Sequence, residues 1–111
     1  MNQYRKVLPI SRTEAIAVFG GIDVDRIRLT LVRIAFYDPD YEWAQARCLE
    51  FCVHNDPEVR GVAVTCLGHI ARIHRRIDMG KVGPVLDKLA CDSNVAGIVQ
   101  DTLDDIRRFA A

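Results

Sequence analysis

Apolar residues recur along most of the chain at intervals of three and four, the spacing of a helix with one buried face. β-Branched residues are plentiful, but they follow the same helical spacing, so no strand is predicted. The pattern is clearest between residues 56 and 77, where the apolar positions are Val59, Val62, Ala63, Cys66, Leu67, Ile70, Ile73 and Ile77. The sequence therefore predicts an all-α fold.

Start and stop signals divide this pattern into helices. Ser11 with Glu14 three residues later forms a capping box, and Gly20-Gly21 ends the helix that it begins. Asp23 can cap a second helix that continues to about Tyr37. These signals predict a first helical pair over residues 11–37.

Four more helices are predicted beyond this pair. Asp38-Pro39-Asp40 and Asp56-Pro57-Glu58 each combine a capping acid with a proline at the first helical position, which predicts a third helix and a fourth over 56–76. Gly80 and Pro84 mark a break before a short fifth helix that ends near Cys91, and Asp92-Ser93 begins the sixth. The predicted units are residues 11–37, 38–76 and 80–110 of one domain, 1–111.

The chain contains an internal repeat. Residues 56–72, DPEVRGVAVTCLGHIAR, align without a gap to residues 92–108, DSNVAGIVQDTLDDIRR, at an offset of 36. A helical pair that recurs at such a period is typical of a stacked repeat, in which neighbouring pairs share an apolar core that one pair cannot bury. We therefore expect an α-solenoid of about three antiparallel helix pairs. Gly61 and Gly68 fall inside a helix of this repeat, which predicts close approach of a neighbouring helix.

The repeated units resemble HEAT repeats. The family pattern D-x-x-V-R-x-x-A-x-x-x-L-G-x-I is present as Asp56, Val59, Arg60, Ala63, Leu67, Gly68 and Ile70. The third unit departs from it with Ala96 in place of the arginine and Asp104 in place of the glycine, and unit 11–37 matches only in helix length and capping. The resemblance implies that Arg60 pairs with an acid of an adjacent repeat and belongs to the scaffold.

Composition and charge restrict the function. Fifteen basic and fifteen acidic residues cancel, so the overall charge gives no reason to expect nucleic acid or an anionic membrane as partner. No apolar run approaches the ~20 residues of a membrane span. The amino-terminal stretch 1–14 lacks the long apolar core of a signal peptide, so a cytoplasmic location is expected.

No catalytic, cofactor or metal site is predicted. His69 and His74 are five residues apart, about 140° around a helix, and so do not share a face as zinc ligands would. No phosphate-binding glycine loop, G-x-S-x-G or H-E-x-x-H occurs. An enzyme built from cysteine and histidine by tertiary contact stays open. The cysteines, which we expect to be reduced thiols packed in the core, are Cys48, Cys52, Cys66 and Cys91.

Two charged regions are candidates for contact with a protein partner. Residues 38–58 carry six acids against one arginine, whereas 59–81 carry five basic residues against one acid. Capping acids and a solvated helix end explain these runs as well as an interface does. An interface would use the aromatic residues and arginines, which dominate binding hot spots, with Trp43 as the sharper candidate. The predicted partner-binding residues are Tyr37, Asp40, Glu42, Trp43, Thr65, His69, Arg72 and Arg76.

The sequence thus predicts a protein-binding module without enzymatic activity. A freestanding three-unit protein of this kind is similar to small bacterial immunity proteins encoded beside polymorphic or contact-dependent toxins, and the run CLGHIARIHRRID resembles HEAT-repeat proteins found in such contexts. This resemblance implies that the protein binds the C-terminal domain of a toxin and blocks its active site or the approach of its substrate. The alternatives are an adaptor or assembly factor, or an accessory subunit of a modifying enzyme. Nucleic acid is disfavoured as a partner, because the basic residues do not recur from unit to unit. No small-molecule substrate is predicted.

Overall fold

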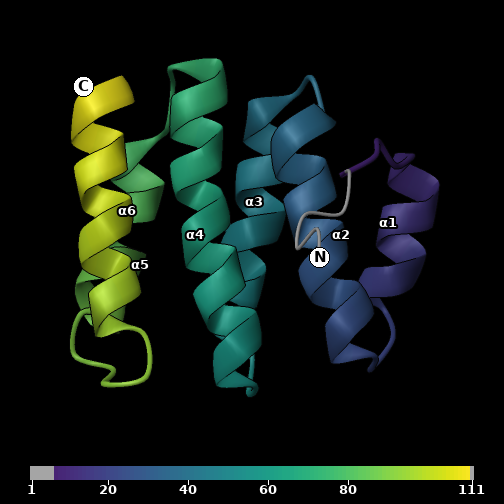
Figure 1. The fold of residues 1–111 in the computed structure, drawn as a ribbon, viewed down its shortest axis with the longest axis horizontal. Coiled ribbons are helices and arrows are strands. Elements are labelled where there is room, and N and C mark those ends of the chain that lie inside the picture. Colours follow the sequence, from purple (N-terminus) through teal and green to yellow (C-terminus); the bar gives the residue numbers. More distant parts are fainter. Residues whose placement is uncertain (1–6, 111) are drawn as a thin grey trace, which may run out of the picture.

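Consecutive helices run in opposite directions and form three hairpins that lie side by side (Figure 1). The computed structural model describes residues 7–110. Within them the helices are α1 (Arg12–Phe19), α2 (Val24–Tyr37), α3 (Tyr41–Phe51), α4 (Pro57–His74), α5 (Met79–Leu89) and α6 (Ala96–Phe109), and no strand occurs. The prediction of an all-α fold with six helices is confirmed.

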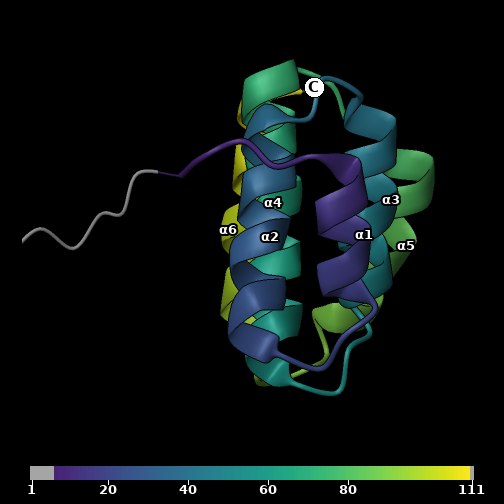
Figure 2. The same ribbon diagram turned by 90° about the vertical axis from the view of Figure 1, so that its right-hand side faces the viewer.

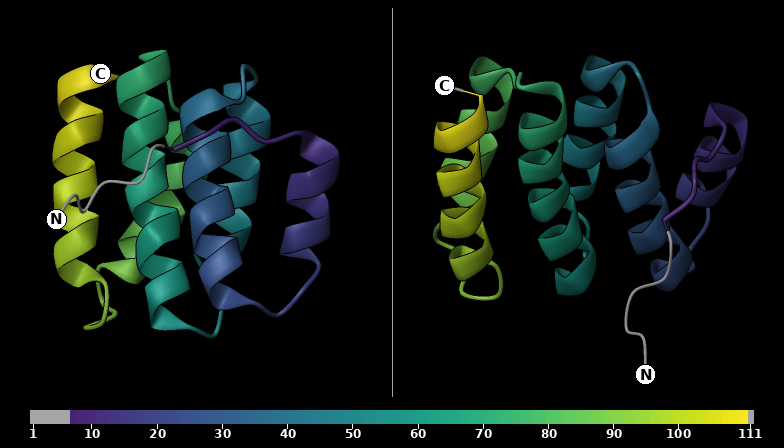
Figure 3. Two further views of the ribbon diagram at one scale, coloured as in Figure 1. Left: turned by 45° about the vertical axis from the view of Figure 1, so that its right-hand side comes forward. Right: turned by 45° about the horizontal axis from the view of Figure 1, so that its top comes forward.

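The hairpins build two layers. Figure 2 shows α2, α4 and α6 in one layer and α1, α3 and α5 in the other. The oblique views of Figure 3 show α1 and α6 at opposite ends of the stack. Helix α4 is central, since it packs against α2, α3 and α6. Most of its predicted apolar face is completely buried, as at Leu67 and Ile70, whereas Ile73 is 39% exposed.

Aspartate caps begin most helices by accepting hydrogen bonds from the free N–H groups of the first turn. Asp56 accepts from Glu58 and Val59 at 2.8 and 3.3 Å. Asp40 caps α3, and the expectation that α3 starts at Asp38 is wrong. Asp38 ends α2 instead, because its own N–H still donates to the carbonyl of Ile34 at 3.0 Å.

Helix α5 begins earlier than the sequence predicted. Asp78 caps it by accepting from the N–H of Gly80 at 3.0 Å, so Gly80 and Pro84 lie inside the helix and do not mark a break before it. A proline within a helix removes one hydrogen bond to the carbonyl four residues earlier, here that of Gly80. Both residues are exposed, so water can satisfy that carbonyl.

Two other helix ends differ from the prediction. Helix α4 stops at His74 because Arg75 adopts a left-handed conformation (φ 56°, ψ 25°), which leaves Arg76 and Ile77 beyond its end. Helix α6 begins at Ala96, after one turn in which the Asp92 side chain accepts from Asn94. The carbonyl of Asp92 already accepts from Ala96, so this turn leads directly into the helix.

The repeat brings α4 and α6 into close contact. A Cβ on Gly61 would lie 3.0 Å from Cδ1 of Ile98, and one on Gly68 would lie 3.2 Å from Oδ2 of Asp105. The predicted close approach of a helix at both glycines is confirmed. Arg60 reaches across the same pair to Asp92 at 3.1 Å, which confirms its scaffold role.

Most cysteines lie in the core. Cys48, Cys52 and Cys66 are buried free thiols, as predicted, whereas Cys91 is exposed at the turn after α5. Its placement in the core was therefore wrong. A hydrogen bond with Cys66, together with burial, raises the pKa of Cys48 well above its ordinary value, and burial raises the pKa of Cys52 to about 12. Such thiols stay protonated and pack as small apolar groups.

None of the helices within residues 7–110 is both long enough and apolar enough to traverse a bilayer. The expectation that residues 1–14 form no signal peptide depends partly on residues 1–6, which lie outside the described residues.

Candidate protein-binding surface

Three of the predicted site residues form a stripe along α4. Thr65, His69 and Arg72 are spaced by four and three residues, so they share one face of the helix. Thr65 is exposed in a groove of ≈ 450 Å³ between the amino-terminal halves of α4 and α6. His69 and Arg72 lie one and two turns further on, towards the carboxyl end of α4.

At the carboxyl end of α4, this stripe meets an aromatic ring of α2. The ring of Phe36 lies edge-on to that of His69, with centroids 5.0 Å apart and planes at 84°. The guanidinium of Arg72 lies 6.0 Å from the centroid of Phe36, and its Nη2 is 3.1 Å from Nδ1 of His69. Tyr37 follows on the same helix, with its ring 6.3 Å from Phe36. The structure thus brings Tyr37, His69 and Arg72 together around Phe36.

Two further arginines continue this arrangement beyond the helix. Arg75 lies over Phe109 of α6, 5.2 Å from the ring centroid, and Arg76 lies over Tyr41 of α3, 5.0 Å from the centroid. Three guanidinium groups at the end of α4 therefore lie against three rings, each from a different helix. We call this set the arginine–aromatic surface; it consists of Arg72, Arg75, Arg76, Phe36, Tyr41 and Phe109.

The charge of this surface is not neutralised within the described chain. No ion pair within residues 7–110 involves the three guanidinium groups, whereas other arginines pair with carboxylates. All three side chains are exposed. The carboxyl ends of α2, α4 and α6 lie together at the top of Figure 1, and their last carbonyls favour positive charge nearby.

The acidic segment before α3 makes contacts within the fold. The carboxylate of Asp40 accepts from the N–H groups of Glu42 and Trp43 at 3.1 and 3.2 Å and lies 3.4 Å from Arg12. Trp43 is half-buried, and the guanidinium groups of Arg12 and Arg47 lie 4.6 and 5.5 Å from its ring centroid. Asp40 and Trp43 therefore contribute to joining α1 to α3. Glu42 is exposed in the first turn of α3.

Arg12 also holds the loop between α2 and α3. Its Nε and Nη2 donate to the two carboxylate oxygens of Asp38 at 3.1 and 2.9 Å. Burial by itself would raise the pKa of Asp38, but the hydrogen bonds from Arg12 and from the N–H of Asp40 outweigh burial and bring that pKa below its ordinary value.

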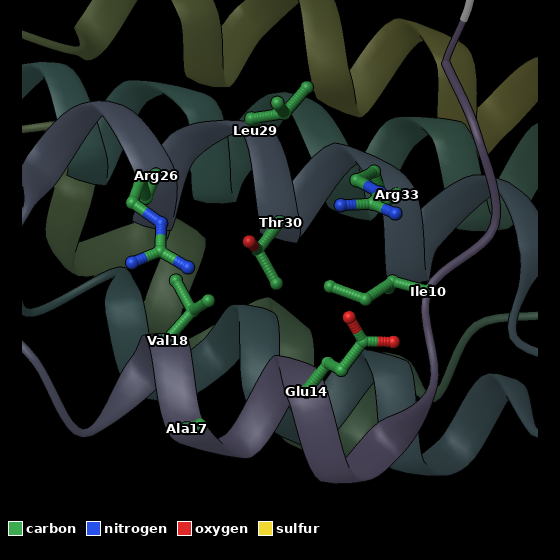
Figure 4. A pocket seen from close by; sticks show the side chains of 8 residues that line it. All are labelled: Ile10, Glu14, Ala17, Val18, Arg26, Leu29, Thr30 and Arg33. Atoms are coloured by element: carbon green, nitrogen blue, oxygen red, sulfur yellow. The ribbon is translucent and has the colours of Figure 1, made fainter.

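Two residues of α2 bind the chain that precedes α1. The hydroxyl of Tyr37 donates to the carbonyl of Val7 at 2.8 Å. Arg33 donates to the carbonyls of Leu8 and Pro9 at 2.8 and 2.7 Å. A second pocket, of ≈ 220 Å³, opens beside these contacts between α1 and α2 (Figure 4). Figure 4 shows Glu14, Arg26 and Arg33 around it.

His69 lies beside the arginine–aromatic surface and has an altered pKa. Burial lowers its pKa from the ordinary 6.5, and the nearby charge of Arg72 lowers it further, while Asp105 opposes the change. His69 is therefore neutral at neutral pH. Within residues 7–110, no three histidine, cysteine or acidic side chains are grouped as a metal site requires.

Sequence reasoning missed Phe36, Tyr41, Arg75 and Phe109. Phe36 lies beside the predicted Tyr37, and Arg75 lies between the predicted Arg72 and Arg76, so both lie in the region that the sequence singled out. No local signal indicates which arginine meets which ring, because the three rings come from α2, α3 and α6.

Comparison with known proteins identifies a relative by structure. No protein-family model matches the sequence, and no curated protein does. Among solved structures, a chain in the crystal structure of a CDI complex from Cupriavidus taiwanensis LMG 19424 matches with a TM-score of 0.88 and 32% sequence identity. The match covers 100% of both chains. At this identity over the full length, the protein belongs to the same family as the matched chain of the Cupriavidus taiwanensis CDI complex.

Proposed function

We propose that this protein is the immunity protein of a contact-dependent inhibition (CDI) system, which binds the C-terminal domain of its cognate toxin and neutralises it in the cytoplasm. The observation that carries the proposal is the full-length match, at 32% identity and a TM-score of 0.88, to a chain of a CDI complex. In this proposal, the hairpins are HEAT-like units and the protein acts by binding, without catalysis.

The physical properties of the fold suit such a role. Its helices share one continuous core centred on α4, so the surface is preformed before a partner arrives. A preformed surface loses little conformational entropy on binding, which favours tight capture. The exposed arginines and aromatic rings at the end of α4 are the residue types that dominate protein interfaces.

Neutralisation is tested by rescue. The C-terminal domain of the large toxin encoded beside the gene would be expressed in a heterologous host, with and without this chain. We expect growth only when this chain is present, and co-purification of the two proteins as a complex of fixed stoichiometry. An immunity protein from an unrelated toxin system, expressed to the same level, is the control for specificity.

Failure of the rescue experiment would decide between two explanations. If the folded chain is present and the toxin domain still kills the host, this cognate pairing is rejected. If the chain joins the toxin domain to a third protein while leaving its toxicity intact, the adaptor alternative takes its place.

A further inference from the structure

Each of the three arginines at the end of α4 lies against an aromatic ring of the same chain. Each guanidinium lies 5.0 to 6.0 Å from the centroid of a ring, and the rings belong to α2, α3 and α6. Contact with an aromatic face restrains a side chain that otherwise loses much rotamer freedom on binding. These arginines therefore present their hydrogen-bond donors at low entropic cost.

Compensation of the helix dipole does not account for all three arginines. One cation in the last turn provides most of that effect, and Arg72 already lies there. Arg75 instead occupies the one non-glycine position with positive φ in residues 7–110. Glycine is the residue favoured at such a helix end, and a strained side chain at a surface is an indication of function. Unlike a glycine at this position, Arg75 places a guanidinium group over the ring of Phe109.

The three guanidinium groups, which form no ion pair within residues 7–110, indicate the chemistry of the partner. The planar guanidinium fork binds a carboxylate with two parallel hydrogen bonds. On α6, Asp105 packs beside Gly68, which lies one turn before Arg72. A negative group at this edge repels a continuous phosphate backbone but leaves room for separate carboxylates beyond the end of α4.

We propose that the arginine–aromatic surface docks a segment of the toxin domain that presents two or three carboxylates, which pair with Arg72, Arg75 and Arg76. This inference rests on the proposed function and adds the face and the chemistry of binding to it. The rings beneath the guanidinium groups provide apolar contact around the ion pairs, so that water is partly excluded from them.

The test compares charge variants by titration calorimetry with the purified toxin domain. The variants are Arg72→Glu, Arg75→Gly and Arg76→Glu. The matched control is Lys88→Glu, which reverses one exposed charge on α5 in the other layer. We expect each surface variant to raise the Kd at least about 10-fold, and the control to leave it unchanged. Wild-type affinity should also fall as salt increases from about 0.05 to 0.3 M, less steeply in the variants.

Arg75→Gly keeps the test decisive if a charge reversal disturbs folding, because glycine relaxes the backbone at this position. Circular dichroism confirms the helical fold of every variant. If the wild type binds the toxin domain and all three variants bind it with the same affinity, the docking surface is overturned and the proposed function stands. No binding by the wild type would overturn both. Tight binding of a single-stranded RNA oligonucleotide that Arg72→Glu abolishes would assign the surface to nucleic acid instead.

Discussion

The left-handed conformation of Arg75 can be tested by comparing the stabilities of two variants, because the sign of their difference depends on the backbone conformation at this residue. Its φ of 56° and ψ of 25° place it in the left-handed region, where Cβ crowds the following carbonyl. This conformation costs an L-residue about 1–2 kcal/mol, a cost that glycine does not have. We therefore compare Arg75→Gly with Arg75→Ala.

Both substitutions remove the guanidinium and its contact with Phe109, worth about 0.5–1 kcal/mol at an exposed site. The difference in unfolding free energy between the two variants therefore reports the contribution of the backbone conformation alone. Glycine loses more chain entropy on folding, by about 0.5–1 kcal/mol, which partly offsets the relief. We expect Arg75→Gly to be the more stable of the two by about 0.5–1 kcal/mol, and close to the wild type.

Urea unfolding followed by circular dichroism at 222 nm would measure this difference. In thermal unfolding, it corresponds to about 2–4 °C in Tm for a chain of this length. In the interior of a helix, the order is reversed, with alanine about 1 kcal/mol more stable than glycine. If the two variants are equally stable, or if Arg75→Ala is the more stable, α4 continues through Arg75 and the strained left-handed conformation at this helix end is refuted.

Other substitutions test the core and the surface. Leu67→Ala removes a completely buried side chain and should lower the free energy of unfolding by about 2–5 kcal/mol in urea denaturation, with a loss below 1 kcal/mol counting against its burial. Gly68→Val should cost about 1–3 kcal/mol in the same assay, because even a Cβ there lies 3.2 Å from Asp105, and an unchanged midpoint would contradict the close approach of α6. Because folding lowers the pKa of His69, the unfolded chain binds more protons than the native one below about pH 6.5, and the free energy of unfolding should fall on acidification. In His69→Gln, that part of the pH dependence should vanish. An unchanged slope of stability against pH would exclude His69 as its source. Trp43→Ala should keep the helical circular dichroism and weaken toxin binding by at least about 2 kcal/mol if the ring is a hot spot, whereas unchanged affinity would leave it a scaffold residue.

The candidate site was only partly accessible from sequence. Arginines and aromatic residues near the ends of two helices drew attention to one region, in which the structure gathers Tyr37, His69 and Arg72 around Phe36. Asp40 and Trp43 were chosen for the same chemistry, but the structure places them against Arg12. Composition cannot separate these outcomes, because a charged aromatic segment suits a scaffold contact and an interface equally well.

Features that depend on a few neighbouring residues followed from the sequence alone. The capping acids Asp23 and Asp56 act on N–H groups three and two residues away, and most of the buried face of α4 follows from its own spacing. Gly61 and Gly68 indicated a close neighbour because a helix tolerates such residues at a cost. Local hydrogen bonds and helical period need no knowledge of the rest of the chain.

Tertiary structure decided which distant groups meet. Only the packing of three hairpins brings Phe109 to Arg75 and turns Arg33 to the chain before α1. It also decided that Pro84 stays inside α5, where water can replace the lost donor. These outcomes depend on contacts between residues tens of positions apart, and their energies are set by the relative placement of whole helices, which no local pattern encodes.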